Sequence, residues 1–342
     1  MTEQATGREM TAAVVAERLG LHGDHLPWLD RLEALGPPAG PTPLPHGDAL
    51  RALLIRIGTP PLDADEIVRL RPDPATSPEL WWLLERCHHS LIADMGGTGY
   101  RPDLPSLPDR LGAAGRFFYV HVFVATIPAV RRFHRLRGVP EDITWATLAD
   151  LGDKISIHRR TYGRGGLNTQ FWFTLCFRGA IYALGRLQFD MEYFGQSGHP
   201  GGIPVDEGDP VLGVHIPEPG GPFTPALCDA SIARAAPFIE SHFPEFFAPG
   251  KPKVAICNSW LLDPQLADYV SETSNIVAFQ RRFALLPEEH DGDRGIIEFV
   301  FRQVDPDLAS LPRHTTLQRA VVDHLRAGKH WRARTGWFAL PE

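Results

Sequence analysis

Hydrophobic and polar positions repeat with a helical period in the first half of the chain and with a period of two in much of the second half. Apolar residues at helical spacing predict helices over 11–20, 48–58 and 77–96, each ending on glycine. The apolar stretch 115–138 has the same spacing, so we expect a helix there, with a kink at Pro128. The first half is therefore predicted to be a helical domain.

In the second half, alternation over 184–194 predicts a strand with Asp190 and Glu192 on its polar face. The next short alternating run, at 211–217, is separated by two prolines and a Gly-Gly pair from a run with helical spacing at 225–243. Further strands are expected over 211–217, 253–263, 275–286 and 295–304, with a hairpin loop over 287–295, and helices over 225–243, 263–270 and 315–328. These elements predict an α+β protein, with a helical domain over 1–155 and a mixed sheet flanked by helices over 156–342.

Composition narrows the class of protein. The net charge is −7 with no block of like charge, which argues against a nucleic-acid surface. The chain contains no run of eighteen apolar residues, so no membrane span is predicted, and its first residues lack the pattern of a secretory signal. The four cysteines are scattered and form no CxxC pair, so no disulfide framework is predicted. The adjacent histidines at 88–89 do not have the spacing of metal ligands, so no metal site is predicted either. We expect a cytoplasmic protein whose oligomeric state is left open.

The segment between the strand at 211–217 and the following helix has the features of an anion-binding loop. Thr224 before Pro225 suits a helix N-cap, and Gly220 and Gly221 let the backbone approach a ligand closely. The helix start could then hold a phosphate or pyrophosphate. The alternative is a tight turn that binds nothing.

Three other side chains are candidates for chemistry. His215 ends the strand beside this loop and could act as a general base, or it could be structural. Asp190 and Glu192 could raise each other's pKa and supply a base, or they could form a solvated sheet face. Cys228, in the first turn of the helix, could be a nucleophile paired with His215, or a small buried apolar residue.

The order of elements resembles the latter part of the GNAT acyltransferase fold. The stretches "GRLQFDMEYF", "VLGVHIPEPGG", "NSWLLDPQL" and "SNIVAFQRRF" are similar to bacterial, largely actinobacterial, acyltransferases with an N-acyltransferase N-terminal domain and a GNAT-like C-terminal domain. The stretch "FYVHVFVATIPAVRRFHRLRGVPEDITWATLADLG" resembles the end of that N-terminal domain. The resemblance covers about residues 50 to 330.

This resemblance implies transfer of an acyl group from acyl-CoA or acetyl-CoA to a small-molecule amine or hydroxyl acceptor. It places the central strand at 211–217, the pyrophosphate loop at 218–231, and the pantetheine arm between that strand and the one at 253–260. No metal, nucleic acid or membrane is expected to take part. The residues implied in donor binding are Val214, Ile216, Gly220, Gly221, Thr224 and Cys228.

For the chemistry, the resemblance implies a base that deprotonates the acceptor and a group that protonates the leaving thiolate. His215 is the first candidate base and Glu192 the second. Ser259 and Tyr269 are candidates to protonate the thiolate.

The loop departs from the family pattern [RQ]-x-x-G-x-[GA], because "EPGGPFTPALCDAS" contains no basic residue. A non-catalytic binding or regulatory protein on the same scaffold therefore stays open. A thiol or serine hydrolase is also considered, although no G-x-S-x-G motif supports it.

Overall fold

The computed structural model describes residues 10–101, 103–195, 202–247 and 249–341. The chain forms two compact units whose segments alternate along the sequence. The first unit comprises residues 1–134, 148–159 and 164–179, and the second comprises residues 135–147, 160–163 and 180–342. The sequence boundary expected at 155 thus falls inside the interleaved region, and the last crossing lies at Gly179 and Ala180.

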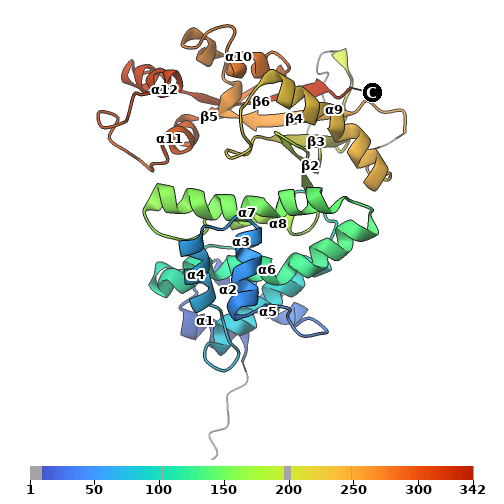
Figure 1. Cartoon of the computed structure of the whole chain (residues 1–342), viewed down its shortest axis with the longest axis vertical. Coiled ribbons are helices and arrows are strands. Elements are labelled where there is room, and N and C mark those ends of the chain that lie inside the picture. Colours follow the sequence, from blue (N-terminus) through green and yellow to red (C-terminus); the bar gives the residue numbers. More distant parts are fainter. Residues whose placement is uncertain (1–9, 102, 196–201, 248, 342) are drawn as a thin grey trace, which may run out of the picture. The chain divides into compact units, whose positions relative to one another are not determined.

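The first unit is helical, as the apolar spacing predicts (Figure 1). Thr11 caps its first helix by accepting a hydrogen bond from Val14 N, and Gly20 ends that helix with a left-handed φ of 58°. The helices are α1 (Ala12–Leu19), α2 (His25–Leu35), α3 (Gly47–Arg56), α4 (Pro61–Arg69), α5 (Pro78–Ala93), α6 (Gly112–Leu136), α7 (Glu141–Tyr162) and α8 (Gln170–Cys176). Helix α7 contributes residues to both units.

The core of this unit is built on α6. Its Phe123 stacks on Phe177 at 4.8 Å between ring centroids and also contacts Phe173 of α8. The helix, with Asp109–Leu111 before it, is long and apolar enough to cross a membrane, but 72% of its most apolar window is buried. Such burial is typical of a core helix, and Pro128 lies inside it as expected.

The second unit contains a six-stranded sheet in the order β1-β2-β3-β4-β6-β5 (Figure 1). β3 and β4 pair in parallel, and the other neighbours pair antiparallel. The strands are β1 (Ile181–Ala183), β2 (Gln188–Tyr193), β3 (Pro210–His215), β4 (Val254–Ser259), β5 (Ala284–Asp291) and β6 (Arg332–Ala339). The predicted strand over 184–194 is therefore a hairpin turn followed by β2.

Helices pack on one face of this sheet. Phe238 of α9 (Pro225–His242) contacts Tyr182 of β1, and Phe279 of α10 (Asn275–Gln280) contacts Phe283, which packs edge-on against Phe338 of β6. The opposite face carries a row of cross-strand partners: Asp190, Gly213, Ile256, Trp337 and Ala284. The polar face of β2 thus shares one side of the sheet with Gly213.

Two predicted strands and the hairpin loop predicted between them were wrong in whole or in part. The segment 275–286 begins with α10, which Ser274 caps by accepting from Val277 N, and only its end enters β5. The segment 295–304 lies mostly in helix α11 (Asp293–Phe301), and 287–295 is the end of β5 and the start of α11 rather than a hairpin loop. Short apolar runs fit either period, so local caps decide between them.

The remaining elements complete the second unit. β4 ends at Ser259 and is followed by the short 3-10 helices Trp260–Leu262 and Pro264–Asp268, so the strand predicted to reach 263 is shorter. Helix α12 (Thr316–Arg326) starts at a capping box formed by Thr315 and Gln318. With α11 it encloses a separate apolar core that includes Val321, Val322 and Trp331. β6 was not predicted, because it begins with mostly polar, half-buried residues and its place in the sheet comes from pairing with β4 and β5 on its two edges.

In the first unit, Gly152 of α7 lies close to the backbone of residues 57–59, and a substitution there can test the packing. A Cβ placed on Gly152 of α7 would lie 2.2 Å from Ile57 O and 2.5 Å from Thr59 N. We expect Gly152→Ala to lower the free energy of unfolding by at least ~2 kcal/mol, because backbone cannot yield as a flexible side chain does. Urea denaturation measures the change. Gly40→Ala, where no atom lies within 4 Å of the added Cβ, is the matched control, and equal effects of both would contradict the described packing.

Candidate active site

The two parallel strands at the centre of the sheet separate toward their carboxyl ends. Within the described residues, β3 and β4 share the partner pairs Leu212 with Ala255 and Gly213 with Ile256. Beyond these, β3 stays paired with β2 as far as His215, and β4 stays paired with β6 as far as Ser259. The outer edges are satisfied while the inner edges part, so a gap opens between the strand ends.

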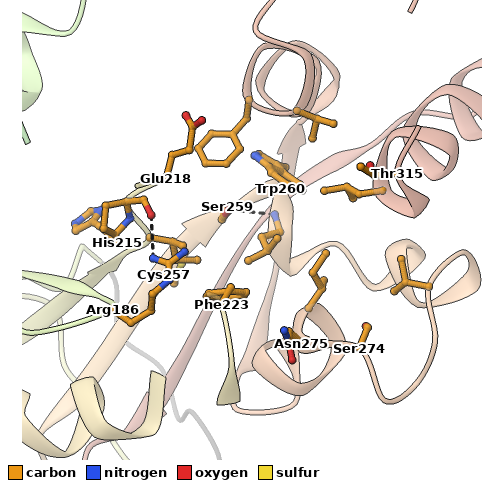
Figure 2. A pocket seen from close by; sticks show the side chains of 18 of the residues that line it. Arg186, His215, Glu218, Phe223, Cys257, Ser259, Trp260, Ser274, Asn275 and Thr315 are labelled. Carbon is orange, nitrogen blue, oxygen red and sulfur yellow. Dashed lines mark hydrogen bonds between the residues drawn. The ribbon is translucent and has the colours of Figure 1, made fainter. Parts of the chain in front are cut away.

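A pocket of about 860 Å³ fills this gap and continues beside it. Its size falls within the range usual for small-molecule sites. In Figure 2, Arg186 and His215 lie on one side, Ser274, Asn275 and Thr315 on the other, and Ser259 and Trp260 between them. Most of its apolar wall comes from the end of β3 and the residue after it, the 3-10 turn after β4, and helices α10 and α11: Val214, Ile216, Trp260, Leu261, Ile276, Phe299 and Val300. A long apolar group with a polar end would fit such a lining.

His215 lines the pocket at the end of β3 and is held by a buried carboxylate. Its Nε2 lies 2.6 Å from Oδ1 of Asp190, whose side chain is 1% exposed. With Asp190 ionised, Nε2–H donates to it, and Nδ1 then carries the lone pair that can accept a proton. The structure therefore brings the first candidate base into the pocket with a fixed orientation.

Glu192, the second candidate base, lies on the same face of β2 but in a different surrounding. Burial first, and the Asp190 carboxylate second, raise its pKa to about 8. It is therefore mostly protonated at neutral pH, and it lines a smaller cavity with Val211, Ile256 and Glu288 rather than the main pocket. The contribution of Asp190 to the raised pKa of Glu192 matches the sequence argument, whereas the alternative of a solvated face does not fit the burial of these carboxyls.

Arg186 supplies the positive charge that the loop sequence lacks. It comes from the turn between β1 and β2, is 7% exposed and lines the pocket. Its Nη1 donates to Pro217 O at 2.8 Å, its guanidinium lies 5.1 Å from the Phe223 ring centre, and its Nε has no hydrogen-bond partner among the described residues. Burial lowers the pKa of this guanidinium. The sequence analysis missed it because the turn is distant in sequence from the loop it contacts.

The loop after β3 is only partly placed as predicted. Thr224 caps α9 by accepting a hydrogen bond from Leu227 N, as expected. Gly221 has φ +79°, a conformation that favours glycine, and a Cβ on Gly220 would lie 2.8 Å from Nη1 of Arg186. Neither glycine, nor Thr224, lines the pocket, whereas Val214 and Ile216 do.

The two residues predicted to protonate a leaving thiolate have different positions. Ser259 lines the pocket, and its Oγ accepts a hydrogen bond from Leu261 N, which leaves its own proton to donate. Tyr269 does not line the pocket. Its hydroxyl hydrogen-bonds Nδ1 of His324, and its ring packs on Trp331 in the core formed with α11 and α12.

Thiol chemistry is disfavoured by burial. Cys228 is 1% exposed, and burial raises its pKa despite its place in the first turn of α9. Cys257, which lines the pocket, has its pKa raised to about 12 by burial and by Glu192. Neither thiol ionises near neutral pH. The structure does not support the nucleophile considered for Cys228, which also does not line the pocket.

Comparisons with known proteins agree with this architecture. The model of the N-acyltransferase N-terminal domain matches residues 48–179, and the model of the GNAT-like C-terminal domain matches residues 181–338. A search of curated proteins found no match. Across the described residues, no group of three His, Cys, Asp or Glu side chains is arranged to hold a metal ion.

Solved structures similar to this chain include three acyltransferase complexes. One is a mutant acyltransferase with octanoyl-CoA (46% identity), one an acyltransferase with decanoyl-CoA and teicoplanin (47%), and one an acyltransferase with decanoyl-CoA (48%). Each has a TM-score of 0.89 and covers 97% of this chain and 100% of its own. The chain belongs to the family of acyltransferases that join an N-acyltransferase N-terminal domain to a GNAT-like C-terminal domain, and it is an acyl-CoA-dependent acyltransferase.

Proposed function

We propose that this enzyme transfers an acyl chain such as octanoyl or decanoyl from CoA to an amine of a glycopeptide of the teicoplanin class. The identity of 46–48% to acyltransferases that bind these acyl-CoAs, one of them together with teicoplanin, supports both substrates. The observation that carries the proposal in this chain is the gap between β3 and β4, which has His215 at its rim and a largely apolar pocket beside it.

The gap suits an extended donor. Where β3 and β4 part, their facing edges carry backbone N–H and C=O groups that the sheet no longer pairs. The amide groups of a pantetheine arm could pair with these edges and seat the thioester near His215. The acyl chain would then lie against the apolar wall that includes Ile276, Phe299 and Val300.

In the reaction, Nδ1 of His215 accepts a proton as the acceptor nitrogen attacks the thioester carbonyl carbon. The new C–N bond forms, the C–S bond breaks, and the CoA thiolate leaves. Ser259, whose hydroxyl lines the pocket, is the candidate that donates a proton to this thiolate; it regains a proton from water, and His215 releases the one it accepted. Tyr269 is a weaker candidate for this proton transfer, because it packs against the neighbouring apolar core and does not line the pocket.

The substrate proposal is tested by mass spectrometry of the products. Incubation with decanoyl-CoA and a teicoplanin-class glycopeptide bearing a free amine should add one decanoyl group to the glycopeptide. Hydrolysis of the thioester without transfer would contradict the proposal. Faster acylation of a simple amine such as glucosamine than of the glycopeptide would keep the enzyme class but overturn the acceptor.

His215→Ala should separate chemistry from donor binding. Loss of a general base typically slows the chemical step by about a hundred- to ten-thousandfold. We therefore expect kcat to fall by that order, while the dissociation constant of decanoyl-CoA, measured by calorimetry, stays within about threefold. Full activity in this variant would show that another group or water takes the proton.

Arg186→Met should weaken binding of the anionic donor. Removing a buried positive charge that has no acidic partner in the described structure is expected to raise the dissociation constant of decanoyl-CoA about tenfold, or ~1.4 kcal/mol. S-Decanoyl-pantetheine, which has no pyrophosphate, should bind wild type and variant alike.

The control for this experiment is Arg234→Met. Arg234 is exposed on α9, and its Nη1 lies near the same turn, 3.8 Å from a Cβ placed on Gly185. It should not alter donor binding. An equal effect on decanoyl-CoA and S-decanoyl-pantetheine would instead assign Arg186 a purely structural role.

A further inference from the structure

A glycine opposite a buried aspartate makes room for the hydrogen bond that orients His215. Asp190 on β2 and Gly213 on β3 are direct partners in the sheet, and His215 lies two residues further along the same face of β3. At such a diagonal position, a short carboxylate reaches the imidazole only by leaning across the residue between them. That residue is Gly213.

The space over Gly213 is already occupied. A Cβ built on Gly213 would lie 1.9 Å from Oδ1 of Asp190, the same oxygen that contacts His215 Nε2, and 2.7 Å from Oε1 of Glu192. Any other residue would therefore push the carboxylate away from the imidazole. Gly213 is not one of the glycines with a positive φ, so the backbone conformation does not itself demand glycine here.

We infer that Asp190 is a positioning residue for His215 and that Gly213 is required because it admits the Asp190 carboxylate. This inference rests on the proposed role of His215 as the base. Asp190 fixes the tautomer with the proton on Nε2 and stabilises the imidazolium that forms when Nδ1 accepts the proton from the acceptor.

Glu192 completes this group as a neutral neighbour. The ionisable groups around the pair are His215 on β3, Cys257 on β4 and Glu288 on β5, besides Asp190 and Glu192 on β2 themselves. The raised pKa of Glu192 favours its protonated form at neutral pH, and the carboxyl in contact with the imidazole is that of Asp190.

The first experiment compares rate–pH profiles of kcat/KM. Asp190→Asn removes the charge but keeps the shape, so kcat should fall at least ~10-fold and the acid limb should move to lower pH. Glu192→Gln should leave the acid limb where it is in wild type. A shift of the limb in Glu192→Gln, with none in Asp190→Asn, would assign the titrating base to Glu192 and overturn the inference.

The second experiment is a double-mutant cycle on Gly213. Gly213→Ala should lower kcat about as much as Asp190→Ala, and it should lower kcat little further when Asp190 is already Ala, because the closest clash is then gone and only the contact with Oε1 of Glu192 remains. Gly195→Ala, just after β2 with no atom within 4 Å of the added Cβ, is the matched control. Additive losses would show that Gly213 acts independently of Asp190.

Calorimetry with decanoyl-CoA distinguishes a loss of activity caused by a mispositioned His215 from one caused by loss of donor binding. The inference predicts that Gly213→Ala and Asp190→Asn still bind the donor with a dissociation constant close to wild type. Loss of donor binding together with kcat would show a collapsed site and overturn the positioning role. Full activity in His215→Ala would overturn the function of the base itself, whatever the cycle gives.

Discussion

The parting of two parallel strands is the constraint on which the rest of this site depends. β3 and β4 are held on their outer edges by β2 and β6, so their ends diverge after Gly213 and Ile256 without loosening the sheet. The divergence leaves backbone polar groups on two facing edges without partners from the sheet, so they are available to water or to a ligand. The amide groups of the proposed acyl-CoA donor would replace the missing partners if its pantetheine arm lies extended in this position.

Burial then sets the charges around the gap. Asp190 is shielded from water and faces His215, whereas Glu192 is held mainly neutral and the thiols of Cys228 and Cys257 are held protonated. Of the groups assigned a part in the proposed reaction, His215, Arg186 and Ser259 line the pocket, and Asp190 contacts His215 from β2. Because Cys228 and Cys257 are buried and stay protonated, a mechanism with a thiol nucleophile is unfavourable.

Sequence patterns predicted much of this arrangement, and the failures have physical reasons. The helical first unit, the capped helix after Thr224 and the place of His215 in the pocket follow from local periodicity and local chemistry. α11 was mistaken for a strand because a short apolar run fits both periods, and β6 was missed because its burial comes from its neighbours. Arg186 and the pairing of Asp190 with Gly213 depend on register between strands, which a single sequence does not specify.

The most direct test of this account is a crystal structure of the enzyme with a non-reactive thioether analogue of decanoyl-CoA. The account predicts the pantetheine arm extended between the ends of β3 and β4, with the sulfur beside His215 and the decyl chain against Phe299 and Val300. An analogue bound elsewhere, with no part of it between the residues after Gly213 and those after Ile256, would contradict it.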